Sequence, residues 1–283
     1  MKDFLAQLGW ELYRMFVRKR TWIGFWVFLA LEGAILGLLH LPRINEAVIR
    51  IIGRSTGSLD TYFSALTVAF IILLFTVFLL GAVALSLVCG DILAKEQEDG
   101  NLRLLLARPV SRLRLLVVKY LACQIYTALF FSFVVLLAFL VGLAYRGWGG
   151  GMLVLPSPEK PQISLFDWGE GLGRLALLVP FFTVVYLPVT SLSFCFSCTR
   201  MKPASATIIT ISILMADFVL AKIPWFEDYK HWFITPRMEK WVYAVHQHIP
   251  WPAVWETAIQ LGTIGFTAFI IGWFVFERRD LKS

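Results

Sequence analysis

The sequence predicts an all-α integral membrane protein with six transmembrane helices. Of its 283 residues, 58% are hydrophobic and only 16% are charged, whereas about a quarter of the residues are charged in a soluble domain. The apolar residues also gather into runs of roughly 20, the length that an α-helix needs to cross about 30 Å of hydrocarbon. The six runs are Trp22–Leu41, Tyr62–Cys89, Tyr120–Tyr145, Leu175–Cys198, Ala204–Ala221 and Ala258–Phe276. We therefore expect a single transmembrane domain over residues 1–283.

Residues 1–20 predict an amphipathic helix. Phe4, Leu8, Leu12 and Met15 recur at helical spacing, and charges collect toward the end of the segment. This pattern is typical of a helix that lies in the membrane interface, although a soluble amphipathic helix would look the same. The apolar run that follows is longer than the hydrophobic core of a signal peptide, so we expect it to be a retained first span.

Basic residues predict the orientation of the spans. With the N-terminus inside, the cytosolic segments hold 16 of the 26 Lys and Arg residues, as the positive-inside rule requires. The four cysteines all fall near the cytosolic ends of their predicted helices, where thiols stay reduced. We expect a multi-pass protein of the cell membrane, in contact with its lipids, with both termini in the cytosol.

The longest outer loop, residues 222–257, predicts short helices before the last span. Thr235 and Pro236 are typical of an N-cap and a first helical position. Met238, Trp241, Val242 and Val245 would then share one face. We expect an amphipathic helix on the outer leaflet, anchored by tryptophans.

Residues 90–119 form a charged island between the second and third runs. The sequence Asp99–Gly100–Asn101 predicts the end of one helix. A leucine-rich segment follows, and Arg108–Pro109 ends it, because the residue before proline disfavours the helical region. Ser111 can cap the helix that enters the third span. The apolar ridge of this short segment needs a cover: the lipid interface, the protein's own helices or a partner.

The motif in the island resembles the signature of type-2 ABC-transporter permeases. It runs Glu96-Gln-Glu98-Asp-Gly100-Asn-Leu102, then Leu105-Leu106, Pro109-Val-Ser111-Arg112 and Lys119. The six-span layout and the tail from Phe276 to Leu281 extend the resemblance over most of the chain. Asn101 stands where the family usually has threonine, and both residues can cap a helix.

This resemblance implies a permease that pairs as a homo- or heterodimer and is joined by a cytosolic nucleotide-binding ATPase. Residues 95–110 would be the coupling helix in a groove of that ATPase, and the helices around residues 225–250 would gate the outer side. The coupling residues it implies are Glu96, Glu98, Gly100, Leu102, Leu105, Leu106, Pro109 and Arg112. The sequence has no G-x-x-x-x-G-K-[ST] motif, so ATP and magnesium would be bound by the partner subunit.

Glu32 and Asp217 are ionisable residues within predicted spans, and such residues are expensive to insert into a bilayer. Glu32 could face the transport pathway or be satisfied within the bundle, whereas Asp217 would lie near the outer boundary, close to Lys222. In the fourth run we expect Pro180 and Pro188 to break the helix.

Three glycines of the last run, Gly262, Gly265 and Gly272, permit close helix approach. The pair Cys195 and Cys198 predicts packing rather than a metal site, because no second pair of ligands accompanies it.

Two other function classes stay open from the residues alone. One is a membrane scaffold or sensor that recruits an ATPase without transporting anything, since it would share the same docking segment. The other is a polytopic membrane enzyme, which is disfavoured because the spans have no paired acids or His/Asp cluster at their ends. We expect no catalytic site, no metal and no nucleic-acid partner, and we expect the chain to be the permease of an exporter.

Overall fold

The chain folds as an all-helical membrane protein with one small hairpin. The structure is a computed structural model that describes residues 2–42, 62–100, 111–154 and 164–278. Within these residues, six helical stretches are long and apolar enough to cross a membrane, and each overlaps one predicted run. They span Thr21–Leu39, Ala65–Glu98, Arg112–Arg146, Trp168–Ser197, Pro203–Ala221 and Trp251–Glu277. The prediction of six membrane-spanning helices is confirmed.

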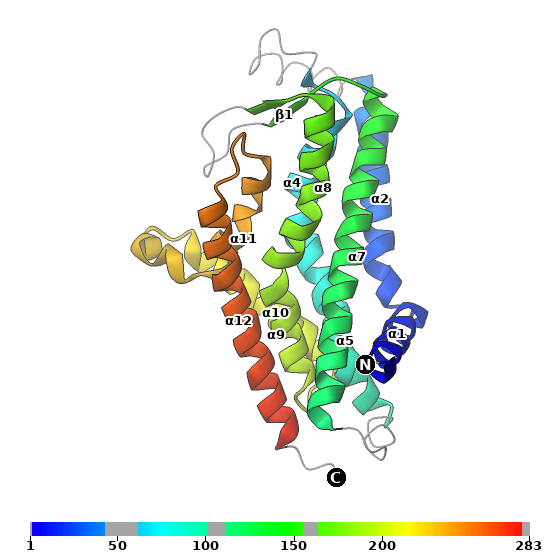
Figure 1. The fold of residues 1–283 in the computed structure, drawn as a ribbon, viewed down its shortest axis with the longest axis vertical. Coiled ribbons are helices and arrows are strands. Elements are labelled where there is room, and N and C mark those ends of the chain that lie inside the picture. The colour runs from blue at the N-terminus through cyan, green and yellow to red at the C-terminus, as the bar shows by residue number, and fades with distance from the viewer. Residues whose placement is uncertain (1, 43–61, 101–110, 155–163, 279–283) are drawn as a thin grey trace.

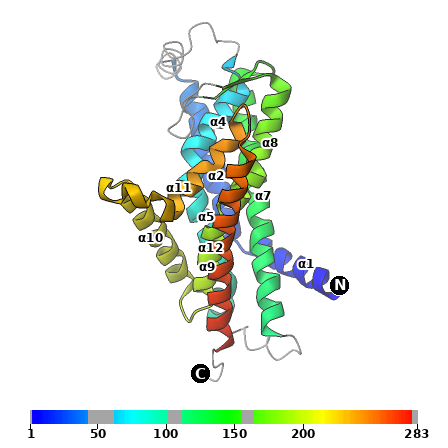
Figure 2. The ribbon, with the colours of Figure 1, turned by 60° about the vertical axis from the view of Figure 1, so that its left-hand side comes forward.

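Helix α1 (Lys2–Val17) projects sideways from the bundle beside α7, and a short turn joins it to α2 (Thr21–Leu39) (Figure 2). The turn is held by the side chains of Thr21 and Trp22, which donate to the carbonyls of Met15 and Phe16. One face of α1 packs on the core through Leu8. The predicted helix is confirmed, and its place in the membrane interface stays a prediction.

The second membrane-length stretch changes helical type in its middle. It consists of α4 (Ala65–Thr76), a π-helical segment (Val77–Gly81) and α5 (Ala82–Glu98). A π-helix leaves carbonyls without their usual partners. The hydroxyl of Tyr186 donates to the carbonyls of Val77 at 2.8 Å and Phe78 at 3.0 Å.

Tyr186 itself lies at an interruption of the fourth stretch. Helix α8 (Trp168–Val185) ends before it, and α9 (Leu187–Ser197) starts after it with Pro188 in its first turn. Pro180 lies inside α8 without ending it. The predicted break at Pro188 is therefore confirmed, and the one at Pro180 is wrong, because α8 continues through it to Val185.

The longest helix, α7 (Arg112–Arg146), packs against α1, α2, α4 and α8 (Figure 1). Close approach to α4 depends on Gly142, where a Cβ would overlap the carbonyl oxygen of Ala65.

Strands β1 (Met152–Val154) and β2 (Ser164–Phe166) form an antiparallel hairpin over one end of the bundle. Both strands are largely buried, and β1 packs against α4 whereas β2 packs against α8.

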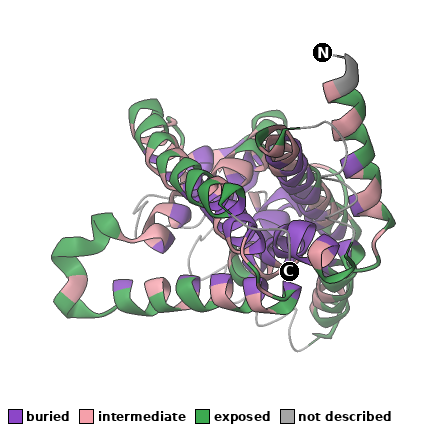
Figure 3. Cartoon of the chain, turned by 90° about the horizontal axis from the view of Figure 1, so that it is seen from below, coloured by how far each residue is buried: buried purple, intermediate pink, exposed green. Residues whose placement is uncertain are grey.

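Helix α10 (Pro203–Ala221) and the 3₁₀ segment η3 (Pro224–Trp232) lean away from the bundle (Figure 2). The chain then returns through α11 (Ile234–Met238) and the 3₁₀ segment η4 (Glu239–Val245). Seen from below, the buried residues gather in the bundle and the leaning arm is largely exposed (Figure 3).

Helix α11 begins at Ile234, two residues before the expected first position at Pro236, because of a side chain from α10. The carboxylate of Asp217 accepts hydrogen bonds from the backbone of Ile234 at 3.0 Å and of Thr235 at 2.7 Å. It also accepts from the Thr235 hydroxyl at 2.7 Å. Asp217 thus satisfies the free N–H groups at the start of the helix, and the prediction that Thr235 is the N-cap is wrong.

The four residues expected on one face of this region, from Met238 to Val245, are indeed buried. They face the bundle, however, and the Trp241 ring lies 5.8 Å from Phe70 and 5.0 Å from Phe182, centroid to centroid. The prediction that Trp241 anchors the helix in the outer leaflet is wrong, because the protein's own core covers it.

The last helix, α12 (Trp251–Glu277), packs along α9. A Cβ at Gly265 would overlap Leu187, and one at Gly272 would lie 3.2 Å from the Cα of Cys195. Gly262 has open space around it. The prediction of close approach is confirmed for the first two glycines and is wrong for Gly262.

Candidate functional site

The charged island begins and ends as its sequence predicts. Helix α5 ends at Glu98, and Gly100 follows with φ 73°, a left-handed conformation that glycine adopts without steric cost. Helix α7 begins at Arg112, and the Ser111 hydroxyl accepts a hydrogen bond from the backbone N–H of Arg114 at 3.3 Å. Between these ends, residues 101–110 lie outside the described residues, among them Leu102, Leu105, Leu106 and Pro109.

A buried ion-pair cluster joins the two flanking helices to α1. Lys119, in the second turn of α7, is fully buried, Glu96 of α5 is almost fully buried, and Glu11 of α1 is buried with a small exposed part. The ammonium of Lys119 donates to Glu96 Oε1 at 2.8 Å and to Glu11 Oε2 at 2.9 Å. One cation therefore connects three helices that are distant in the sequence.

Arg14 of α1 and Arg18, the residue directly after this helix, complete the cluster from the solvent side. Arg14 Nη2 lies 3.2 Å from Glu96 Oε1, and Arg18 Nη2 lies 3.5 Å from the same oxygen. Arg14 also lies 3.6 Å from Glu11 Oε1. The cluster thus consists of Glu11, Arg14, Arg18, Glu96 and Lys119, with three cations around two carboxylates.

Such a cluster is costly to assemble and costly to break. Each ion loses several kcal/mol of hydration when it is buried, and removal of one partner from a buried pair costs about 3–5 kcal/mol. Glu96 Oε2 has no hydrogen-bond partner among the described residues, so all of its compensation comes through Oε1. The arrangement therefore holds α1, α5 and α7 in one relative position.

A second ion pair connects the start of α2 to α5. Arg20 Nη1 lies 2.9 Å from one carboxylate oxygen of Asp91 and 3.2 Å from the other. The hydrogen bond to Asp91 raises the pKa of Arg20 above its already high value, so the arginine is charged at any physiological pH. The α1–α2 turn is thereby attached to α5 at two levels, Asp91 and Glu96.

The two acids of the motif have different surroundings. Glu96 is buried in the cluster, whereas the Glu98 side chain is 47% exposed. Lys95 Nζ lies 2.8 Å from Glu98 and 3.1 Å from Asp99, and all three side chains reach solvent. Glu98 is therefore available to a partner, and Glu96 is available only to the protein's own helices.

The first turn of α7 contacts both ends of the chain. Arg112 donates to the carbonyl of Glu277, at the end of α12, with a distance of 2.8 Å. Arg114 Nε donates to Gln7 Oε1 of α1 at 3.0 Å. Parts of α1, α5, α7 and α12 therefore meet where the island returns to the bundle.

Sequence reasoning identified Glu96 and Lys119 through the motif but missed Glu11, Arg14 and Arg18. These three recur at intervals of three and four residues, the spacing of one helical face. That spacing was the available signal. It predicts only a charged face on an interfacial helix, because the partners at positions 96 and 119 are remote in the sequence.

Glu32 lies in α2 and is fully buried. Neither of its carboxylate oxygens has a hydrogen-bond partner among the described residues. It lies inside the subunit rather than on a surface that another subunit would complete. A role in a transport pathway stays a prediction.

The four cysteines are buried free thiols. Those of Cys89 and Cys123 contact each other between α5 and α7, and Cys198 packs against Gly272. In the part of the chain that the structure describes, no group of three or more His, Cys, Asp or Glu residues could hold a metal.

Comparison with known proteins gives a family for this arrangement of helices. The profile of a family described as "ABC-2 family transporter protein" matches residues 18–223, well over half of the chain. The match begins at Arg18 and includes both flanks of the island. No curated protein matches the chain significantly.

Proposed function

This chain belongs to the ABC-2 transporter family, and we propose that it is the permease of an ATP-driven exporter. In this proposal a separate nucleotide-binding subunit contacts residues 95–110 and binds ATP and magnesium. A second permease copy completes the pathway. The family assignment makes the chain a membrane component of a transporter; the ATPase partner, the direction of transport and the dimer are the parts that we propose.

The observation that carries the proposal is the buried ion-pair cluster on both sides of residues 101–110. Glu96 lies four residues before Gly100, and Lys119 lies seven residues after Arg112. Because Lys119 contacts both Glu96 and Glu11, a push on the segment between Glu96 and Lys119 acts on α1, α5 and α7 together. This is what a coupling segment requires, since a flexible attachment would absorb the movement.

Exposed acidic side chains next to residues 101–110 support a docking surface on the ATPase that carries the opposite charge. Glu98 and Asp99 reach solvent at the end of α5. We expect them to face basic residues of the ATPase, while the leucines at positions 102, 105 and 106 supply apolar contact. Charge complementarity of this kind mainly sets orientation and association rate.

The leaning arm of α10 and η3 supports a second permease copy. Large apolar side chains are exposed along it, namely Ile208, Val219, Trp225, Tyr229 and Trp232. Exposed apolar side chains gathered on one arm are covered by lipid or by another protein surface. If the arms of two copies packed against each other, the apolar side chains of both arms would be buried.

The test is co-expression of the chain with the ATPase encoded beside it, followed by purification through one subunit. We expect the wild type to retain the ATPase and to support its ATP turnover. Leu105→Asp and Glu98→Arg should each reduce retention and turnover, since one places a charge on the apolar ridge and the other reverses the exposed acid.

The matched control is Glu227→Arg, which reverses an exposed acid on η3, far from the island in the sequence. It should retain the ATPase fully. If Leu105→Asp or Glu98→Arg co-purifies and turns over ATP like the wild type, the docking segment is assigned wrongly.

A further inference from the structure

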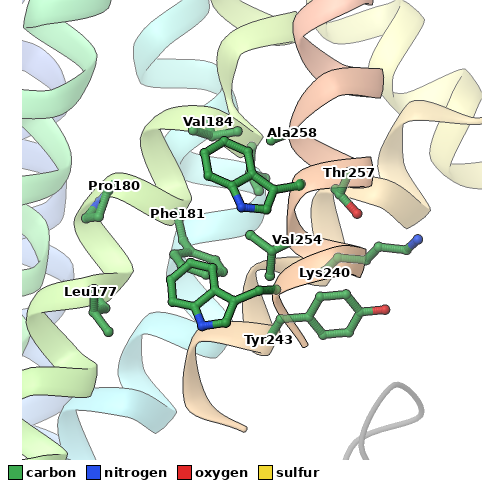
Figure 4. Close-up of a pocket in the computed structure, with 12 residues that line it drawn as sticks. Leu177, Pro180, Phe181, Val184, Lys240, Tyr243, Val254, Thr257 and Ala258 are labelled. Carbon is green, nitrogen blue, oxygen red and sulfur yellow. The ribbon is translucent and has the colours of Figure 1, made fainter. Parts of the chain in front are cut away.

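A groove of about 270 Å³ opens between α8, η4 and the first turns of α12 (Figure 4). Its wall is almost entirely apolar and aromatic. Lining side chains come from α8, such as Pro180 and Val184, and from α12, such as Val254 and Ala258. The groove is open on one side, so it communicates with the surroundings of the protein.

The walls of this groove are held in place by polar contacts behind it. Arg174 of α8 donates to the carbonyls of Ala244 at 3.4 Å and Gln247 at 3.1 Å, which fixes the end of η4 against α8. Trp241 packs into the core from the same segment. The groove is thus a preformed feature of the fold.

The size and lining of the groove suit part of a hydrocarbon chain. Drug-sized ligands occupy pockets of about 300–1,000 Å³ and bury most of their surface. A groove of this volume, open along one side, holds only a segment of a molecule whose remainder lies outside. Trp251 and Trp255 line it at the start of a membrane-length helix and are exposed. Tryptophans favour the boundary between hydrocarbon and headgroups.

The one charged side chain among the lining residues is Lys240. It makes no hydrogen bond or ion pair with any described residue. Its nitrogen extends past Thr257 to the edge of the set of lining residues (Figure 4). A lysine can lay its aliphatic stem on an apolar surface while its ammonium stays in a polar zone. The ammonium is thereby available to an anion just beyond the apolar groove.

We propose that this groove binds a bilayer phospholipid with an anionic headgroup, one acyl chain lying against α8 and α12 and the phosphate region beside Lys240. The groove and the lysine point to the same occupant, since only an amphipathic molecule satisfies both. The inference does not depend on an ATPase partner. It also differs from a transport pathway, because the site is formed within one subunit.

The test uses the full chain incorporated into nanodiscs that contain equal amounts of phosphatidylglycerol and phosphatidylcholine. Native mass spectrometry then counts the lipids that stay bound after release. The wild type should retain phosphatidylglycerol over phosphatidylcholine by about fivefold, since one lysine beside an anionic headgroup contributes about 1 kcal/mol.

Two variants separate the parts of the site. Lys240→Gln, which removes the charge of a half-buried side chain and keeps much of its length, should lose the preference for phosphatidylglycerol and still retain lipid. Ala258→Trp fills the groove and should lose both lipids. The matched controls are Lys230→Gln, an exposed lysine of η3, and Ile259→Trp, the exposed neighbour of Ala258 on the same helix. Both controls should behave like the wild type.

Equal retention of the two lipids by the wild type would overturn the inference, as would an unchanged preference in Lys240→Gln. If Ala258→Trp lowers the number of copies in the purified assembly without changing lipid retention, the groove is an interface between copies of the chain and the lipid assignment is wrong.

Discussion

Replacement of Lys119 by methionine tests the buried cluster most directly. Each ion pair of Lys119, at 2.8 and 2.9 Å, is attractive by about 6 kcal/mol at an effective dielectric constant of about 20. Much of that attraction is offset by the hydration that the ammonium loses, and the measured cost of removing one partner of a buried pair is about 3–5 kcal/mol.

The loss of stability should fall at the lower end of this range because each carboxylate keeps at least one arginine nearby after Lys119 is replaced. Glu96 keeps Arg14 and Arg18, whereas Glu11 keeps only the longer contact with Arg14 at 3.6 Å. We expect Lys119→Met to destabilise the protein by about 3 kcal/mol. At about 2–4 °C per kcal/mol, that lowers the unfolding midpoint by about 6–12 °C.

The assay is thermal unfolding of the purified protein in one detergent at one scan rate, because membrane proteins commonly unfold irreversibly and the midpoint then depends on the rate. The matched control is Lys95→Met, which removes a lysine paired with Glu98 and Asp99 at the surface. It should move the midpoint little, since exposed pairs are screened by water.

A double variant identifies the mechanism. Adding Glu11→Gln to Lys119→Met should recover part of the loss, because the carboxylate left without its closest cation becomes a neutral amide. If Lys119→Met lowers the midpoint no further than Lys95→Met, Lys119 is not a buried connection between the helices. The coupling argument would then lose its main support.

Two further substitutions test contacts at the other end of the molecule. Asp217→Ala removes the acceptor for Ile234 and Thr235; we expect a loss of about 1–2 kcal/mol and faster hydrogen exchange over residues 234–245, and unchanged exchange would contradict the capping role. Gly142→Ala forces a methyl group into the carbonyl of Ala65 and should lower the unfolding midpoint, whereas Gly173→Ala, with open space around it, should raise it slightly, since alanine in a helix is favoured over glycine by about 0.5–1 kcal/mol. Equal midpoints for the two glycine variants would show that α4 and α7 are not in close contact.

The six spans could be predicted from the sequence because bilayer thickness sets a length that few other segments reach. Their ends could not be predicted in the same way. Helix α5 continues from Cys89 to Glu98, and α7 starts at Arg112, eight residues before the apolar run at Tyr120. A helix does not end where its side chains become polar: α5 ends at Glu98, just before Gly100, and α7 begins directly after Ser111, where the backbone signals are.

The sequence also could not predict what each amphipathic face packs against. Periodicity shows that Glu11, Arg14 and Arg18 share a face, and that Trp241 shares one with Val245. It does not show whether solvent, lipid or another helix lies against that face. For Glu11 the partner is 108 residues away in the sequence. Only the folded arrangement brings Lys119 to it.

The π-helical segment at Val77–Gly81 has a geometric consequence for the charges below it. Each residue of an α-helix advances about 100° around the axis, so one extra residue in a turn rotates everything after it by that amount. Before the segment, α4 packs on α7; after it, α5 packs on α9 and α10. Deletion of a single residue between Val77 and Gly81 would turn Asp91 and Glu96 away from Arg20 and Lys119. The π-helical segment beside Tyr186 therefore sets the direction in which the charged side chains at the end of α5 point. It does so from a distance, because Asp91, the first of these charges, lies about 10 residues after Gly81.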